Sequence, residues 1–395
     1  MSRTFRIVSL ITLIVLVASV VLVGCDSGSS SLSGPIKVGW TGQLSGPSSA
    51  FGIPGQLEFK LAVDDINAKG GILNQKMEVI YLDDAGDPTK QMVNVRQLVE
   101  KEGVVFIMGG GSAPAAVIPY LTEQKISSVS TNAVEEFNDP TKYPFNYGVL
   151  YTNAQVVEKA ASYLVNTLGK KKVGVLAPSS ATGKDQASLS GTLVPKVGGT
   201  VVGTEFVNVG DLDMTTQLQK LKSAGAEALL LWTNAPETPK ILLNKKAMGW
   251  DVPVSGGAGL SATATVNLAG PDAMKNVFNT WWRTMQYAKS PDDLPQRSKD
   301  YIAGMKKVYG DKAEFSWAGK MYDQALLIKI GIERAKSTDA DKIRIALESS
   351  PLTDLVTGKL VFTSKSHSGV PIEALGLGIA STNKDGAMQL AQGEK

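Results

Sequence analysis

Short apolar runs alternate with amphipathic segments along most of this chain, beginning at Ile36. This alternation is typical of parallel strands joined by covering helices, because each parallel connection needs a crossover long enough for a helix. A helix is expected at 54–69, where Phe59, Ala62 and Ile66 share one face before a Gly-Gly stop. The strands expected around it lie at 36–40, 77–82, 104–108 and 126–130.

The same pattern repeats in the second part of the chain. A helix is expected at 154–168, followed by strands at 173–177, 201–207 and 228–232 and by helices at 214–223 and 237–248. Beyond residue 282 the chain is mostly helical, with Tyr301, Met305 and Val308 expected on one face of a helix. The late extended segments at 359–363 and 374–380 need a sheet to join. The sequence therefore predicts an α/β fold of two doubly wound, Rossmann-like lobes between which the chain crosses more than once.

Several kinds of chemistry are excluded by composition. With one Cys and one His in 395 residues, the chain has no internal disulfide and no zinc site built from several Cys and His residues. A net charge of +3 is too small for a nucleic-acid-binding surface. Gly183-Lys184 does not complete a phosphate-binding motif, so we interpret that segment as a loop, and the turn-like sequence around His367 predicts a surface imidazole. No cofactor and no metal is expected.

The N-terminus is interpreted as a targeting signal. Arg3 and Arg6 precede an apolar run at residues 7–23. The last two residues of this run begin the sequence Leu-Val-Gly-Cys at residues 22–25. This ending resembles the bacterial lipoprotein signal, in which Cys25 carries the lipid and becomes the first residue after cleavage. The alternative is a simple membrane anchor, since about 17 apolar residues is near the lower limit for spanning a bilayer. Either interpretation places the body outside the cytoplasm, and the Ser/Gly-rich stretch that follows is expected to be a flexible tether.

Polar loops follow several of the expected strands. In open parallel sheets the ligand lies beyond the carboxyl ends of the strands, where loops and helix N-termini meet. Ser112 stands before a helical run, so its hydroxyl is expected to cap that helix while backbone N–H groups face an anion. Thr131 and Asn132 offer similar donors, which would hold a carboxylate without Arg or Lys. The alternative is that Ser112 only caps its helix and that 109–111 only turns the chain.

A set of short motifs resembles one known family. In order along the chain they are IKVG (36–39), LSGP (44–47), FG (51–52), AVDDINAKGGI (62–72), DDAGDP (83–88), FSW (315–317) and YDQA (322–325). With this spacing, behind the lipoprotein signal, the chain resembles the extracytoplasmic solute-binding proteins of the branched-chain amino acid type, which feed ABC transporters, over about residues 36–385.

The resemblance implies a type I periplasmic binding protein, in which two lobes joined by three hinge strands close on a solute. It divides the chain into a signal peptide (1–24), a tether (25–35), lobe 1 (36–150 plus 282–371) and lobe 2 (151–281 plus 372–395). Trp281 and Trp282 are then expected to pack at the hinge, and Asp323 is expected to have a structural role nearby.

The family's binding residues carry over position by position. Ser112 and the Thr131–Asn132 loop fall where the family holds the ligand carboxylate, and Phe51 takes the place of an aromatic residue at the pocket mouth. Aromatic side chains elsewhere, Trp232 and Tyr322 among them, are further candidates for an apolar wall. The full set of predicted binding residues is Ser112, Gly111, Thr131, Asn132, Ala133, Phe51, Trp40, Tyr151, Thr182, Asn234, Ala258 and Phe315.

Two departures from the family bear on the solute. Ala258 stands where amino-acid binders have the acid that pairs with the ligand ammonium, and Thr152 likewise replaces a carboxylate. A buried ammonium without a counter-charge costs several kcal/mol, so these changes favour a solute that keeps an anionic end and an apolar or aromatic body but lacks the amine. Asp185 and Glu237 lie in nearby segments, and either would restore the missing acid if the correspondence shifts by a few residues.

Three functions remain open. The first is a monomeric receptor that delivers a small solute to an ABC permease while lipid-anchored to the membrane through Cys25. The second is a receptor of the same fold that signals to a sensor protein. The third, an extracytoplasmic hydrolase, is disfavoured because no motif assembles a nucleophile, a base and oxyanion donors. We therefore expect a binding protein and not an enzyme.

Overall fold

Two larger sheets organise the computed structural model, which describes residues 34–46, 49–108, 113–131, 133–208, 210–233 and 236–394. Neighbouring strands in sheet 1 are parallel. Its strands follow the order β2 (Met77–Asp83), β1 (Ile36–Gly42), β3 (Phe106–Met108), β4 (Ser127–Ser130) and β5 (Asn146–Gly148). Sheet 2 follows the order β14 (Leu375–Ile379), β10 (Val277–Trp282), β9 (Val254–Gly256), β8 (Ala228–Leu231), β6 (Lys172–Pro178) and β7 (Thr200–Val207).

The two sheets share one strand order. Counted from its first strand, each runs 2-1-3-4-5, and sheet 2 adds β14 antiparallel to β10. In this doubly wound order the direction of winding reverses beside the first strand, and ligands bind at the carboxyl ends of the strands around that point. The topology therefore directs attention to the segments that follow β1, β3 and β4 in sheet 1, and β6 and β8 in sheet 2.

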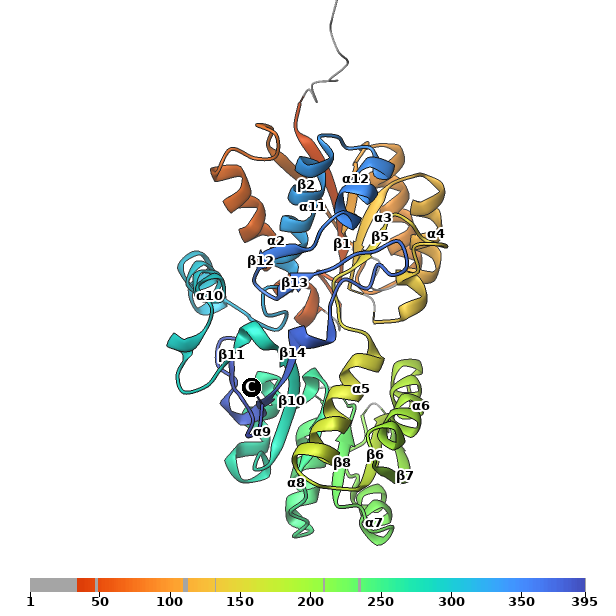
Figure 1. Ribbon diagram of the computed structural model, residues 1–395, viewed down its shortest axis with the longest axis vertical. Coiled ribbons are helices and arrows are strands. Elements are labelled where there is room, and N and C mark those ends of the chain that lie inside the picture. Colours follow the sequence, from red (N-terminus) through yellow and green to blue (C-terminus); the bar gives the residue numbers. More distant parts are fainter. Residues whose placement is uncertain are drawn as a thin grey trace, which may run out of the picture. The chain divides into compact units, whose positions relative to one another are not determined.

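Helices connect and cover these strands (Figure 1). Their starts follow from local sequence: Asp87 caps α3 by accepting the Lys90 N–H, with Pro88 in the first turn. The helices are α2 (Ser49–Ala68), α3 (Pro88–Glu100), α4 (Pro114–Glu123), α5 (Asn153–Ser162), α6 (Ala181–Lys196), α7 (Thr215–Ser223), α8 (Thr238–Ala247), α9 (Thr263–Ala273), α10 (Gln296–Tyr309), α11 (Lys320–Ala335) and α12 (Ala340–Glu348).

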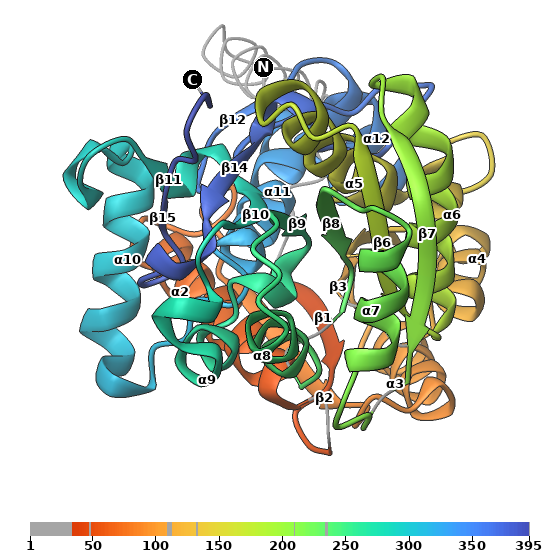
Figure 2. The ribbon, with the colours of Figure 1, turned by 90° about the horizontal axis from the view of Figure 1, so that it is seen from below.

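Sheet 2 is covered by apolar side chains on both faces. Along β8, Leu229 and Leu231 belong to one buried cluster, while Ala228 and Leu230 belong to another. This split follows from the alternation of side chains along a strand, and it explains why β8 reads as a continuous apolar run. Figure 2 shows the strands of sheet 2 succeeding one another from β14 to β7.

The chain passes between elements of the two sheets after β5, after β10 and again before β14. After β10, α11 packs against α2, which follows β1. In Figure 1 the blue C-terminal part of the ribbon accordingly appears both beside α2 and, as β14, beside β10. The late strands β12 (Leu352–Leu355) and β13 (Gly358–Leu360) form a hairpin, and β11 (Gln286–Tyr287) pairs with β15 (Met388–Gln389).

The predicted α/β fold with two doubly wound sheets is confirmed, and the predicted strands appear with shifts of one or two residues at their ends. The loop predicted around Gly183-Lys184 is wrong, because both residues lie in α6, whose start is capped by Ser180 accepting the Gly183 N–H. Strand β10 and helix α12 were not predicted. The exact division of residues between lobes stays a prediction.

Three predictions about single residues have clear outcomes. His367 is fully buried, so the predicted surface position is wrong: its ring stacks on Tyr147 at 4.8 Å, and both of its nitrogens have partners. Asp323 has the expected structural role, since its carboxylate accepts the N–H groups of Val356 and Thr357 at 2.8 Å each. Val308 was expected on the buried face of α10 but is 53% exposed.

Candidate functional site

A cavity of about 470 Å³ lies between elements that belong to the two sheets. One side comes from the segment after β4, and the other comes from the starts of α5 and α6. Its position at the carboxyl ends of strands β4 and β6 is where the topology predicts a ligand. The described lining residues are Ala133, Val134, Glu135, Glu136, Thr152, Asn153, Ala154, Thr182, Asp185 and Leu189.

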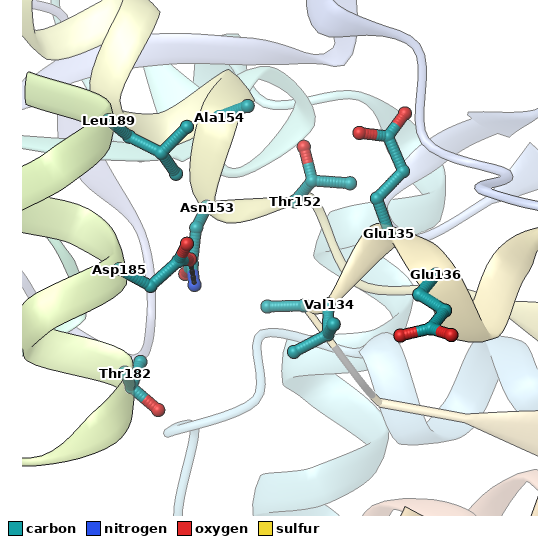
Figure 3. Close-up of a pocket in the computed structure, with 10 residues that line it drawn as sticks. Val134, Glu135, Glu136, Thr152, Asn153, Ala154, Thr182, Asp185 and Leu189 are labelled. Carbon is teal, nitrogen blue, oxygen red and sulfur yellow. Dashed lines mark hydrogen bonds between the residues drawn. The ribbon is translucent and has the colours of Figure 1, made fainter. Parts of the chain in front are cut away.

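Asp185 and Asn153 form the polar centre of this cavity. The Asn153 amide donates to the Asp185 carboxylate at 2.8 Å, so the two side chains hold each other across α5 and α6 (Figure 3). Asn153 Oδ1 in turn accepts a hydrogen bond of 3.4 Å from Gln186. Among the described residues, the second carboxylate oxygen of Asp185 accepts no hydrogen bond, which leaves acceptor capacity on the cavity wall.

The start of α5 links this cavity to a distant part of the chain. Thr152 and Gln155 form a capping box, in which each side chain bonds the backbone of the other. The Gln155 amide also donates to the carbonyl of Val370 at 2.7 Å. The Thr152 hydroxyl is thus committed to the helix end, although the residue also lines the cavity.

The wall opposite Asp185 is acidic. Glu135 and Glu136 begin the short helix that follows β4, and Figure 3 shows both carboxylates on the far side of Val134 from Asp185. Lys142 pairs with Glu136 at 3.2 Å, in an exposed ion pair of small energetic weight. Among the described residues that line the cavity, none is Lys or Arg.

A second constellation surrounds Lys320, the first residue of α11. Its side chain is 5% exposed, and its ammonium lies 4.3 Å from the centre of the Trp317 ring. The rings of Tyr151 and Trp282 lie at 5.8 Å and 5.9 Å from the same atom. Tyr151 follows β5 and Trp282 ends β10, so this cluster gathers residues from two of the places where the chain passes between sheets.

Electrostatics around Lys320 are unusual. Burial lowers the pKa of the Lys320 ammonium to about 7, against the opposing effect of the Glu58 carboxylate. Burial also raises the pKa of Glu58 to about 7, and the Glu58 carboxylate accepts the Tyr301 hydroxyl at 2.5 Å and the Met321 N–H at 3.3 Å. Burial raises the pKa of the Tyr151 phenol to about 12, so this group stays protonated and can donate a hydrogen bond.

Two predicted binding residues line the cavity, and one belongs to the Lys320 cluster. Ala133 and Thr182 are cavity residues, and Thr131 immediately precedes that segment. Tyr151 contacts the Trp282 ring at 5.4 Å and faces the Lys320 ammonium. The remaining predictions fall elsewhere or lie outside the described part of the chain.

Trp40, Ala258 and Phe315 do not line this cavity. The Trp40 ring is 4% exposed and packs on Tyr81 at 5.7 Å, whereas Ala258 is exposed at the start of a short helix. The Phe315 ring lies edge-on to Tyr301 at 6.0 Å. The residues that fall outside the described part are Gly111, Ser112, Asn132 and Asn234, together with the side chain of Phe51.

The N-cap of α4 and the ring of Trp232 also differ from the sequence interpretation. The N-cap residue of α4 is Ala113, one residue later than the predicted Ser112, and the Ala113 N–H donates to Gln91 at 2.6 Å. Trp232 belongs to the buried core of sheet 2, where its indole N–H donates to Ser190 at 3.0 Å. It therefore packs inside the sheet-2 core.

Of the two acids proposed as replacements, only Asp185 lines the cavity. Glu237 is 5% exposed, and its carboxylate accepts the Gly210 N–H at 3.3 Å. Sequence reasoning missed Lys320, because a lysine at the start of an amphipathic helix normally reads as solvated. Its neighbours in sequence, Trp317 and Tyr322, were the only available signal.

Two kinds of feature are absent from the described residues. None of the described helices is long and apolar enough to cross a membrane. In the same part of the chain, no group of three or more His, Cys, Asp or Glu side chains is arranged to hold a metal ion.

Comparisons with known proteins give one consistent result. The model of a family described as periplasmic binding protein matches residues 35–378. A Leu/Ile/Val-binding protein homolog from Brucella melitensis is 28% identical over 361 residues, which cover 90% of this chain and 95% of that protein.

Solved structures agree with this match. A periplasmic binding protein type 1 from Bordetella pertussis has a TM-score of 0.75 at 23% identity, covering 91% of this chain and 98% of that one. The branched-chain amino acid transporter substrate-binding protein LivJ from Streptococcus pneumoniae, solved with isoleucine, has a TM-score of 0.70 at 20% identity, with 90% and 94% covered.

Proposed function

Because this chain belongs to the periplasmic binding protein family, we propose that it is the solute-binding component of an ABC importer and that it captures a small carboxylate-bearing solute by closure of two lobes. The observation that carries the proposal is the cavity whose walls come from the segment after β4 and from the starts of α5 and α6. Residues contributed by both sheets make solute binding sensitive to how the two lobes meet, which is what capture by closure requires.

The acid end of the solute is assigned to the polar loop that follows β4. Thr131 directly follows the carboxyl end of that strand, which is where ligands bind in open parallel sheets. Relatives named as Leu/Ile/Val-binding proteins support an acid of amino-acid size. In this role the protein binds its solute and releases it unchanged.

Whether the solute also carries an amine depends on Asp185. This carboxylate is the one replacement acid that lines the cavity, and it sits 2.8 Å from the Asn153 amide. An α-amino acid would place its ammonium against Asp185, whereas an acid without the amine would leave that carboxylate bonded to Asn153 alone. A ligand panel distinguishes the two forms of the proposal.

The first experiment is a thermal-shift screen of the purified protein. The panel contains L-leucine, L-isoleucine, L-phenylalanine, 4-methylpentanoate, benzoate and phenylacetate, each with its carboxamide. A ligand at 100 times its dissociation constant adds about 2.7 kcal/mol to the stability of the folded state. Stabilisation by acids and not by their amides supports the proposal, and the absence of stabilisation by every acid contradicts it. Mass spectrometry of the recovered ligand should show it unchanged.

We also propose that the mature chain is anchored outside the cytoplasm by a lipid on Cys25, which lies outside the described residues. The support is the sequence of residues 22–25 after a basic and apolar leader. The intact mass of protein purified from membranes should show a diacylglyceryl group and a start at Cys25. Recovery of the uncleaved leader from membranes would contradict the lipid anchor.

A further inference from the structure

Lys320 is a buried lysine without a conventional partner. Its side chain is 5% exposed, and among the described residues no hydrogen bond or ion pair reaches its ammonium. Tyr151, whose ring centre lies 5.8 Å from the same ammonium, likewise has no hydrogen-bond partner for its hydroxyl among the described residues.

A second buried lysine shows what a satisfied lysine looks like in this protein. Lys245 in α8 is 4% exposed, and its ammonium donates to the carbonyls of Trp250 at 3.4 Å and Val252 at 3.2 Å. These two hydrogen bonds pair the ammonium with carbonyls that follow α8, which explains how a lysine can be buried there. Lys320 is buried to the same degree, but its ammonium has no such hydrogen bonds among the described residues. Packing alone therefore does not explain why a charged side chain occupies this position.

The acid that acts electrostatically on the Lys320 ammonium already has hydrogen-bond partners of its own. Glu58 attracts the ammonium electrostatically, but its carboxylate oxygens accept the Tyr301 hydroxyl and the Met321 N–H. The other neighbours of the ammonium are the faces of aromatic rings, which stabilise a cation without pairing its protons. An unpaired donor held in a desolvated place is costly to keep, and such groups concentrate where a ligand completes them.

We propose that Lys320 and Tyr151 form an anion-recognising subsite, in which the Lys320 ammonium and the Tyr151 hydroxyl bind the carboxylate of an aromatic acid. This inference rests on the proposed solute-binding function and names the class of solute. It moves the acid group of the solute from the polar loop after β4, where the sequence analysis and the proposed function place it, to the chain's own buried cation.

The aromatic part of the solute follows from the walls of this subsite. Trp317, Tyr151 and Trp282 surround the ammonium at 4.3–5.9 Å, so a carboxylate that reaches Lys320 brings its attached body against indole and phenol rings. Flat apolar rings pack well in such walls, in stacked or edge-to-face contacts. A short aliphatic acid would leave much of this ring surface without contact.

The subsite is tested by calorimetric titration of the purified protein with matched pairs of probes. The pairs are benzoate with benzamide and phenylacetate with phenylacetamide, and L-leucine and 4-methylpentanoate are the aliphatic comparisons. We expect the protein to bind at least one aromatic acid tenfold or more tightly than its amide, and more tightly than both aliphatic probes. In Lys320→Met the ratio between acid and amide should fall to near one, and Lys320→Arg should keep part of it.

Lys245→Met is the matched control, because it removes a lysine of equal burial in a different place and should keep the wild-type ratio. Lys320→Gln, a smaller change in polarity, serves if Lys320→Met does not fold. The inference is overturned if the Lys320 variants keep the full preference for the acid, or if the wild type binds only the aliphatic probes. In those cases the proposed function still stands, whereas binding of no acid at all would refute the proposed function itself.

Discussion

Replacing Lys320 with Met should stabilise the protein in the absence of ligand. The lysine pKa falls from 10.5 to about 7 on folding, and each pKa unit corresponds to 1.36 kcal/mol. Below pH 7 the folded state therefore bears a penalty of about 5 kcal/mol, because the unfolded chain keeps its ammonium in water. Met has similar length and no charge, so it fills the same space among the rings without this penalty.

The pH dependence separates this effect from a change in packing. Because the folded pKa is depressed, the unfolded chain binds more protons between pH 7 and pH 10.5, and the stability of the wild type rises with pH across that window. The advantage of Lys320→Met should therefore shrink from about 5 kcal/mol at pH 6 to about 2 kcal/mol at pH 9. At pH 6 the raised pKa of Glu58 keeps that acid largely protonated, so loss of its partner costs little.

Thermal unfolding measures this difference. A folded unit of roughly 360 residues unfolds with an entropy of about 0.75 kcal/mol/K, so 5 kcal/mol corresponds to a rise in Tm of about 7 °C. In the control Lys245→Met, Tm should fall, because two carbonyls lose their donor and each costs about 1 kcal/mol or more. An unchanged or lower Tm for Lys320→Met at pH 6, or an advantage that does not vary with pH, would refute the reasoning.

Three further predictions concern other parts of the molecule. Burial lowers the pKa of His367, so the stability that the neutral imidazole contributes is complete above about pH 6.5 and is lost as the pH falls through the pKa of the folded state. His367→Asn should therefore reduce the loss of Tm between pH 7 and pH 5, and an equally steep loss in the variant would count against this. Asp323→Ala should lower the free energy of unfolding in urea by roughly 3 kcal/mol, because the backbone N–H groups of Val356 and Thr357 lose a charged acceptor. A loss under about 1 kcal/mol would be inconsistent with that role. Asp185→Asn should weaken any α-amino acid that binds by about tenfold and change acids without an amine by less than about twofold; calorimetry would show an error if both classes weakened together.

The elements that the sequence predicted best are those with a simple period. Strand β8 is apolar at every position because both of its faces are covered, and α2 buries Phe59, Ala62 and Ile66, which share one helical face. In both, local preference and tertiary environment favour the same structure. The alternation of such elements along the chain indicates a doubly wound α/β fold, which is why the fold class was predictable.

Elements without such agreement were missed. Helix α6 contains Gly183, Gly191 and Pro195, residues that weaken a helix in isolation, so its formation depends on the packing of Ala187 and Val194 against sheet 2. His367 lies in a sequence typical of a turn, yet the fold buries it against Tyr147. Neither outcome can be predicted from the local sequence, because both depend on residues that are far away along the chain.

The candidate site was predicted in part for the same reason. The rule that ligands lie at the carboxyl ends of strands indicated the segments that hold Ala133 and Thr182, and both residues line the cavity. It could not indicate Lys320, because the environment of that lysine is made by Tyr151 and Trp282, which are far from it in sequence. Periodicity describes a residue's own helix and carries no information about which rings the fold brings to it.

The central claim is that this protein recognises the carboxylate of a small solute. The most direct test is a calorimetric titration of the wild-type protein with the acid that stabilises it most in the thermal-shift screen, followed by the carboxamide of that acid. The two probes share one shape and differ in charge. We predict one-to-one binding of the acid and binding of the amide that is at least tenfold weaker; equal affinity for both probes would contradict the account.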